Sequence, residues 1–264
     1  MMPECSDTLY VLRMHKHLYI EHPFLHIMEK VITDDGSVTF YNNEIQDHYH
    51  TKSGGREEAF EKHAKALQVD TIKNPVIFDV CFGLGYNAAA ALDIIDDDVT
   101  VYCFENDREI LKKVLEIEPD FKSYFFIKEF VKKFLEDEET IFIADYKTEN
   151  KIKNNAEEKN DGKKNNRSNK LKLIMMFGDA REEIKKVAEN ADAVFFDPFS
   201  PAKVPELWTK EFFSAIFDQM NKHGKLSTYS CARFVRDNLK HAGFSVRDGP
   251  IIGRRSPSTI AEKK

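Results

Sequence analysis

The stretch that decides the fold is Ile77-Phe78-Asp79-Val80-Cys81-Phe82-Gly83-Leu84-Gly85-Tyr86-Asn87, followed by four alanines, Ala88 to Ala91. The apolar run 76–80 predicts a buried parallel strand, and the two glycines predict a tight turn into a helix of small residues. Such a turn points the unpaired N–H groups of a helix N-terminus toward whatever lies above the strand. It is therefore typical of sites that bind anions and nucleotides.

The remaining chain alternates between apolar runs and charged amphipathic segments, which predicts a doubly wound, parallel α/β sheet of the Rossmann-like kind. A second strand, 99–104, ends in Glu105, about twenty residues past the glycines, where a carboxylate can hold ribose hydroxyls. Further strands are expected at 171–177, 193–196, 225–229 and 244–246. Helices are expected at 110–117, 121–134, 181–190, 205–220 and 233–242.

The first 70 residues read as a small β-rich extension with a lead-in helix. Tyr19-Ile20 and Val38-Thr39-Phe40 flank the turn Asp34-Asp35-Gly36, which predicts a hairpin. Residues 56–67 show helical spacing, with His63 among the residues of the apolar face. We therefore expect an N-terminal extension over 1–70 and a Rossmann-like domain over 71–264. Within that domain, residues 147–170 are mostly Lys, Asn, Glu and Asp, which predicts a disordered insertion.

Composition limits the class of protein. With 264 residues and 42% hydrophobic residues, the chain can bury a full core. Its four cysteines show no paired spacing, no secretory signal opens the chain, and no uncharged run reaches the ~20 residues that span a bilayer. These features predict a cytoplasmic protein without a membrane partner. The formal charge is −6, but residues 203–264 carry 12 Lys and Arg against 6 Asp and Glu, so a local phosphate-binding face is possible beside the simpler interpretation of solvated helix faces.

Four predicted strands end in glycine or carboxylate residues, and in an open α/β sheet these ends surround one ligand. The third glycine of a dinucleotide-binding turn is replaced by Ala88, so Asp79, the two glycines and Glu105 favour S-adenosylmethionine over NAD. Asp179 can accept a hydrogen bond from the base amine of that cofactor, or it can simply cap the helix that follows, and the two roles can coexist.

The segment Asp197-Pro198-Phe199-Ser200 indicates the acceptor. Enzymes that methylate amines need oxygen acceptors around the nitrogen, so that its lone pair faces the methyl group. A strand-end carboxylate followed by proline provides such acceptors. We therefore expect Asp197 to be the catalytic residue and Phe199 to stack on a base. The alternative is a plain turn that ends the strand.

Two His-x-His pairs, His15/His17 and His48/His50, would place both rings of a pair on one face of a strand. No supporting carboxylate or cysteine ligands accompany them, so we predict no metal site.

Five segments resemble the methyltransferase part of the bacterial bifunctional enzymes that make 5-methylaminomethyl-2-thiouridine in tRNA. They cover most of 34–255 apart from the insertion, and they are Asp47-His48-Tyr49-His50 with Gly55-Arg56-Glu57-Glu58-Ala59, Phe82 to Asn87, Asp197 to Trp208, Thr228-Tyr229-Ser230 and Gly253-Arg254-Arg255. The chain departs from the usual pattern at Cys81, where such turns have glycine.

The resemblance implies a class I methyltransferase that passes a methyl group from S-adenosylmethionine to the 5-aminomethyl group of the wobble uridine. It implies a stand-alone form without the FAD-dependent oxidase domain, so a separate enzyme would supply the amine. It also implies that Tyr49 and Glu58 line the cofactor site. The full set of expected cofactor residues is Tyr49, Glu58, Asp79, Gly83, Gly85, Asn87, Glu105, Asn106, Asp179, Ala180 and Asp197.

The expected partner is the tRNA anticodon stem-loop. The residues expected to contact this substrate are Pro198, Phe199, Lys203, Arg233, Arg236, Arg254 and Arg255. Three other classes stay open from the residues alone: an N-methyltransferase or aminopropyltransferase acting on another amine, a non-catalytic RNA-binding partner, and a nicotinamide-dependent dehydrogenase.

Overall fold

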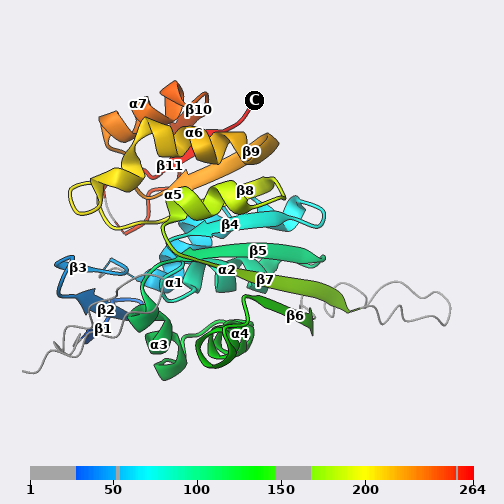
Figure 1. Ribbon diagram of the computed structural model, residues 1–264. Coiled ribbons are helices and arrows are strands. Elements are labelled where there is room, and N and C mark those ends of the chain that lie inside the picture. The colour runs from blue at the N-terminus through cyan, green and yellow to red at the C-terminus, as the bar shows by residue number, and fades with distance from the viewer. Residues whose placement is uncertain (1–27, 52–53, 147–167, 254) are drawn as a thin grey trace, which may run out of the picture.

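A computed structural model describes residues 28–51, 54–146, 168–253 and 255–264. Within these ranges the main sheet has eight strands in the order β10-β11-β9-β8-β4-β5-β7-β6 (Figure 1). Its centre is parallel, as the buried apolar runs predict. The parallel strands are β4 (Val76–Val80), β5 (Val99–Glu105), β7 (Asn169–Phe177), β8 (Ala191–Phe196) and β9 (Met220–Thr228).

Both edges of the sheet differ from the expected all-parallel arrangement, and that part of the prediction is wrong. At one edge β6 (Ile141–Tyr146) runs antiparallel to β7. At the other, β11 (Thr259–Glu262) lies antiparallel between β9 and β10 (Ser245–Asp248). Neither β6 nor β11 was expected from the sequence. β11 has only four residues, and β6, although it begins with apolar residues, is exposed at alternate positions, as an edge strand is and a buried central strand is not.

Helices cover both faces, because neighbouring residues of a strand point to opposite sides of the sheet. Ile77 packs in the core beneath α2, α3 and α4, whereas Phe78 packs in the core beneath α5, α6 and α7. Figure 1 shows α3 and α4 at the bottom and α6 and α7 at the top. The bounds are α2 (Tyr86–Ile94), α3 (Arg108–Glu116), α4 (Tyr124–Asp137), α5 (Ala180–Glu183), α6 (Lys210–Asp218) and α7 (Arg233–His241).

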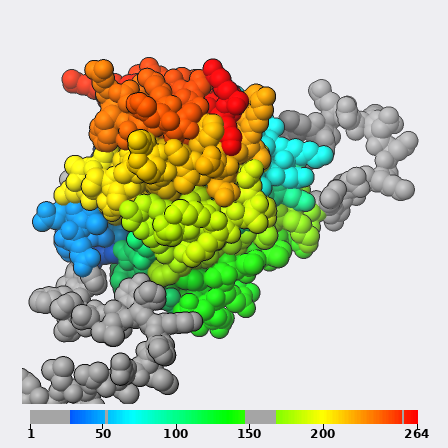
Figure 2. Space-filling model, turned by 45° about the horizontal axis from the view of Figure 1, so that its top comes forward, coloured from blue at the N-terminus to red at the C-terminus, as the bar shows by residue number. Residues whose placement is uncertain are grey.

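The N-terminal extension forms a second, antiparallel sheet of β1 (Glu29–Ile32), β2 (Val38–Asn42) and β3 (Asp47–His48). The expected turn at 34–36 joins β1 to β2, which pair through Ile32 and Val38. The predicted strand at 19–20 lies outside the described residues. Figure 2 shows this N-terminal region, in blue, adjoining the yellow segment near residue 200.

Three expected helices are shorter or less regular than predicted. The lead-in helix consists of α1 (Gly55–Glu58) and a π-helical segment, Ala59–Ala64. The helix expected at 181–190 ends as a 3₁₀ turn at Ile184–Lys186. The helix expected at 205–220 is divided at Thr209, which follows the 3₁₀ turn Pro205–Trp208 and caps α6 by accepting from the N–H of Phe212.

The expected insertion at 147–170 falls mostly outside the described residues, but Asn169 and Lys170 belong to β7. Its predicted disorder stays a prediction. Of the helices in the described part of the chain, none is long and apolar enough to cross a membrane.

Candidate active site

The glycine turn joins β4 to α2 at the side of the sheet where the carboxyl ends of the parallel strands lie. Gly83 has φ 55° and Gly85 has φ 74°, so both occupy the left-handed region that glycine adopts without strain. Gly85 forms the N-cap of α2, and the buried alanines 88–91 let this helix lie close to the sheet. The predicted strand, turn and helix are confirmed.

Glu105 ties this turn to the end of β5. Its Oε2 accepts from the N–H of Gly83 over 2.7 Å, and its Oε1 accepts from the N–H groups of Asn106 and Asp107 over 2.8 and 2.9 Å. Burial raises the pKa of the Glu105 carboxyl to about 7, although the three backbone hydrogen bonds act in the opposite direction. Since each carboxylate oxygen can accept two hydrogen bonds, Oε2 keeps capacity for a ligand hydroxyl.

The N-terminal extension places Tyr49 over the turn. The Tyr49 hydroxyl donates to Oδ2 of Asp107 over 2.6 Å, and its ring centroid lies 4.9 Å from that of Phe199. A Cβ built on Gly83 would lie 3.6 Å from Cδ1 of Tyr49. The structure therefore brings Tyr49, Gly83 and Phe199 together, as expected for residues that line one site.

Asp79 lies beneath the turn and is fully buried. Its Oδ2 accepts from the N–H of Ala88 over 3.1 Å, while its Oδ1 has no hydrogen-bond partner within the described chain. Burial, with the nearby charge of Asp197 as a second cause, raises the pKa of the Asp79 carboxyl well above its usual range. The Asp79 carboxyl is thus held neutral beneath the turn.

Asp197 follows β8 and lies across from the turn. Its main-chain N–H donates to the carbonyl of Val80 over 3.2 Å, and its Oδ2 accepts from Nδ2 of Asn87 over 3.3 Å. The Nε2 of His63 lies 3.7 Å from the same oxygen. The predicted catalytic carboxylate is therefore contacted from the lead-in helix and from α2, both more than a hundred residues earlier in the chain.

Sequence reasoning missed His63 as a site residue. Its imidazole is buried, and Nδ1 lies 2.9 Å from Oγ of Ser227 in β9. The spacing assigned it to the apolar face of a helix. The available signal was the residue type itself, because a histidine among alanines and leucine on a buried face needs a polar partner.

The residues after Asp197 are fixed by the core. Nε1 of Trp208 donates to the carbonyl of Phe199 over 2.9 Å, and the Trp208 carbonyl accepts from Nδ2 of Asn238 over 2.8 Å. Trp208 is fully buried against Phe196. The Trp208 side chain thus anchors the main chain at Phe199, which with Pro198 directly follows Asp197.

Two expected cofactor residues carry other contacts. Asp179 caps α5, accepting from the N–H of Arg181, and its carboxylate also pairs with the Arg181 guanidinium, which lowers the pKa of Asp179. The cap is therefore observed, and the contact of Asp179 and neighbouring Ala180 with a base stays a prediction. Glu58 forms a buried ion pair with Lys62, so its role in lining the cofactor site also stays a prediction.

The expected RNA-contacting residues fall into two groups. Arg233 is 96% exposed, and Lys203 and Arg255 are also exposed. Arg236 is only 23% exposed and pairs with Asp248 over 2.6 Å. Arg254 lies outside the described residues.

The structure describes one of the two histidine pairs. His15 and His17 lie outside the described residues. The His48 ring contacts Tyr41, whereas His50 is buried and stacks on Tyr86 at 4.7 Å. No group of three or more possible metal ligands occurs in the part of the chain that the structure covers.

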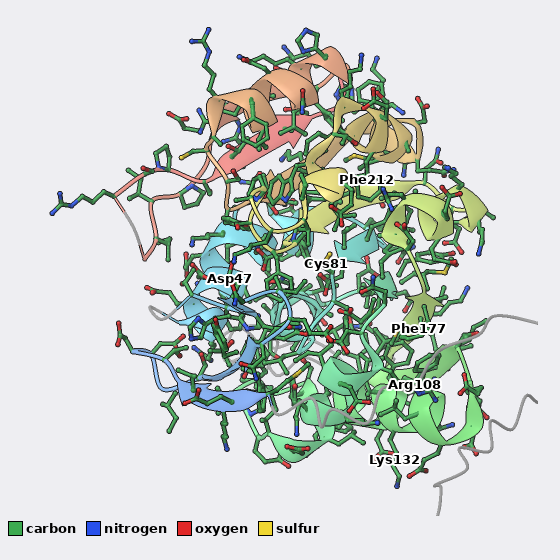
Figure 3. All side chains as sticks on the ribbon, turned by 60° about the vertical axis from the view of Figure 1, so that its left-hand side comes forward. Asp47, Cys81, Arg108, Lys132, Phe177 and Phe212 are labelled. Atoms are coloured by element: carbon green, nitrogen blue, oxygen red, sulfur yellow. The ribbon has the colours of Figure 1, made fainter. Side chains whose placement is uncertain are left out.

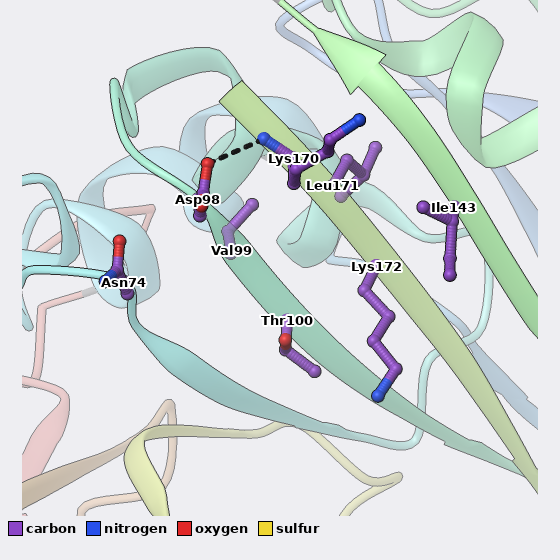
Figure 4. A pocket seen from close by; sticks show the side chains of 8 residues that line it. All are labelled: Asn74, Asp98, Val99, Thr100, Ile143, Lys170, Leu171 and Lys172. Carbon is purple, nitrogen blue, oxygen red and sulfur yellow. Dashed lines mark hydrogen bonds between the residues drawn. The ribbon is translucent and has the colours of Figure 1, made fainter. Parts of the chain in front are cut away.

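A pocket of about 360 Å³ lies at the opposite ends of the strands, beside the amino ends of β5 and β7 (Figure 4). Val99 and Leu171 line it, and the N–H of Lys170 donates there to Asp98 over 2.8 Å. It is remote from the strand ends that carry Glu105 and Asp197.

Comparisons with known proteins bear on the family and the fold. A family model described as S-adenosyl-L-methionine-dependent methyltransferase matches residues 144–264. An uncharacterized protein of Methanocaldococcus jannaschii is 31% identical over 234 residues, which are 88% of this chain and 59% of that protein. The tRNA 5-methylaminomethyl-2-thiouridine biosynthesis bifunctional protein MnmC of Chromohalobacter salexigens is 38% identical over 95 residues, 36% of this chain and 14% of that protein.

The crystal structure of MNMC2 from Aquifex aeolicus superimposes with a TM-score of 0.65 at 30% identity, over 92% of this chain and 72% of that one. A spermidine synthase matches with a TM-score of 0.55 at 13% identity, which shows a shared fold alone. The chain spans 59% of the archaeal relative and 14% of the bifunctional protein. On this likeness, the chain belongs to the MnmC2 family of methyltransferases, whose cofactor is S-adenosyl-L-methionine.

Proposed function

We propose that this protein transfers a methyl group from S-adenosylmethionine to the amine of 5-aminomethyl(-2-thio)uridine at the wobble position of tRNA. The names of the bacterial relatives support the product class. The observation that carries the proposal is the position of Asp197 at the end of β8: its Oδ2 accepts from Asn87 of α2, and it lies two residues before Phe199, whose ring centroid is 4.9 Å from that of Tyr49. An amine held there has a carboxylate acceptor on one side and an aromatic surface on the other.

The residues at this edge fit the cofactor. A side chain on Gly83 would occupy the space in front of Tyr49, so the glycine keeps that space open. Glu105 has capacity for ribose hydroxyls, and the unpartnered Oδ1 of buried Asp79 is a polar atom beneath the same turn. Gly83, Glu105, Asp79 and Tyr49 are therefore the residues that would hold it.

S-adenosylmethionine supplies an electrophilic methyl group on sulfur. The protein must present a neutral amine, because an ammonium group has no lone pair. Asp197 is placed to remove that proton and to accept a hydrogen bond from the nitrogen, which directs the lone pair. Phe199, whose carbonyl is held by Trp208, would stack on the uracil ring and fix its orientation.

The test supplies methyl-labelled S-adenosylmethionine and tRNA carrying 5-aminomethyluridine, so that the result does not depend on which enzyme made the amine. Label should appear in 5-methylaminomethyluridine in the nucleoside digest. Asp197→Asn should lower the turnover by roughly 10²- to 10⁴-fold while cofactor binding, measured by calorimetry, stays within about threefold. An unmodified digest, or an active Asp197→Asn variant, would contradict the proposal.

The same digest separates the alternatives. Aminopropyl transfer would require the decarboxylated cofactor and would add a different mass to the nucleoside. A non-catalytic RNA-binding protein would leave the tRNA unchanged, and a dehydrogenase would bind NAD rather than S-adenosylmethionine in the calorimeter.

A further inference from the structure

A buried histidine connects the proposed catalytic carboxylate to the centre of the sheet. His63 extends from the π-helical segment Ala59–Ala64, and its ring lies between Ser227 and Asp197. Nδ1 is 2.9 Å from the Ser227 Oγ, and Nε2 is 3.7 Å from the Asp197 Oδ2. The ring also contacts Phe195 edge-on at 5.6 Å, so packing fixes its plane.

We propose that His63 is a positioning residue for Asp197 and receives through it the proton that leaves the substrate ammonium. The route uses the tautomer with the proton on Nδ1: the Ser227 Oγ, 2.9 Å away, can accept that proton, which leaves the Nε2 lone pair toward Asp197. This inference rests on the proposed amine substrate. Neither the fold nor the cofactor requires a histidine at this position.

The surroundings keep the imidazole neutral before the reaction. Burial is the largest influence and lowers the pKa of His63, with Lys62 and His50 acting in the same direction. Asp197 and Glu58 favour the cation. A neutral imidazole whose Nε2 lies 3.7 Å from a carboxyl oxygen can accept a proton and then form an ion pair with that carboxyl group.

The proton balance is simple. The substrate ammonium gives a proton to the carboxylate of Asp197, which passes it to Nε2 of His63 and becomes ionised again. The amine lone pair then forms the N–C bond, and the electron pair of the C–S bond stays on sulfur. The 3.7 Å separation must shorten for the transfer, as catalytic contacts often do when substrate binds.

The first test is the pH dependence of His63→Gln, which keeps a polar side chain of similar length and cannot take up a proton. At pH 7 its kcat should fall about 10- to 100-fold, and the loss should shrink to about threefold at pH 9.5, where the amine arrives neutral. Ser227→Ala keeps the imidazole and should give a smaller loss with the same pH trend. A loss by one constant factor at every pH would show a structural role and overturn the inference, as would an unchanged rate.

The second test does not depend on activity. In protein labelled uniformly with ¹³C and ¹⁵N, the His63 ring signal is assigned through the backbone resonances, and its pKa is compared between wild type and Asp197→Asn. The pKa should be lower in Asp197→Asn, because the carboxylate that favours the cation is gone. Equal values would overturn the coupling even if His63→Gln failed to fold. If coupling is present but wild-type protein leaves tRNA unmethylated, the proposed function fails, and the proton route fails with it.

Discussion

The main-chain N–H of Gly83 donates to Oε2 of Glu105 over 2.7 Å, so a buried carboxylate holds the glycine turn against the end of the neighbouring strand. Burial raises the pKa of this carboxyl to about 7, so it changes charge in the range where the protein would work. Glu105 therefore couples the geometry of the turn to pH.

Glu105→Gln should flatten the dependence of stability on pH. A folded-state pKa of about 7 lies above the ordinary value of 4.5, so the folded protein holds a proton that the unfolded chain releases. This contribution is fully present below pH 4.5 and is lost as the pH rises through about 7, a change of about 3 kcal/mol. Urea unfolding between pH 4.5 and 8 should show this loss in wild type relative to Glu105→Gln.

The control is Glu136→Gln, which changes an exposed residue of α4. Its unfolding free energy should follow that of wild type across the pH range. Parallel curves for wild type and Glu105→Gln would mean that Glu105 stays ionised in the folded protein.

Gly83→Ala and Gly85→Ala should separate binding from stability. Both glycines have positive φ, so both substitutions carry a backbone strain of about 1 kcal/mol. A Cβ on Gly85 would also lie 2.7 Å from Phe82 and from Ile127, whereas a Cβ on Gly83 meets no atom nearer than 3.6 Å. Gly85→Ala should lower the thermal midpoint more, while Gly83→Ala should mainly weaken S-adenosylmethionine binding in calorimetry. The reverse order would contradict the placement of the cofactor at Gly83.

The centre of the fold was predictable because its signals are local. The apolar run 76–80, the two glycines and Glu105 lie within about thirty residues, and their roles follow from spacing along one β-α-β unit. The edges gave no such signal. β11 pairs with β9, which lies more than thirty residues earlier in the chain. The four residues of β11 follow a basic segment that predicted a phosphate-binding or solvated face rather than a strand.

The signals for the candidate site divide in the same way between local and distant ones. Asp197 was recognisable from the Asp-Pro-Phe-Ser segment, since a strand-end carboxylate before proline has a local meaning. His63 was not recognisable, because its partner Ser227 is 164 residues away and only the folded sheet brings them together. Asp179 shows a third case, in which the capping role and the proposed base contact use the same carboxylate.

Cys81→Gly should be tolerated or stabilising, whereas Cys103→Gly should not. Cys81 lies in the middle of the molecule at φ 66°, a conformation that favours glycine (Figure 3). Glycine would remove a strain of about 1 kcal/mol and add about the same cost through the freedom of the unfolded chain. Because the two terms roughly cancel, we expect the unfolding free energy to change by less than about 1 kcal/mol. Cys103 is fully buried in β5, so Cys103→Gly should lower the unfolding free energy by about 2 kcal/mol or more. Equal losses in urea unfolding would show that the Cys81 thiol itself stabilises the turn.

Arg233→Gln and Arg236→Gln should act on different properties. Arg233 is almost fully exposed on the first turn of α7 and meets Asp237 only at 3.6 Å, so its charge remains available to a phosphate. Arg233→Gln should leave the unfolding free energy unchanged. It should make the slope of the logarithm of the tRNA binding constant against the logarithm of salt concentration shallower by about one. Arg236 bonds to Thr259 and to the Ser258 carbonyl besides Asp248, which joins α7 to the last strands. Its loss should cost about 1 to 3 kcal/mol in urea unfolding. Salt titrations of tRNA binding test the role of Arg233: an unchanged slope for Arg233→Gln would mean that the RNA phosphates lie elsewhere.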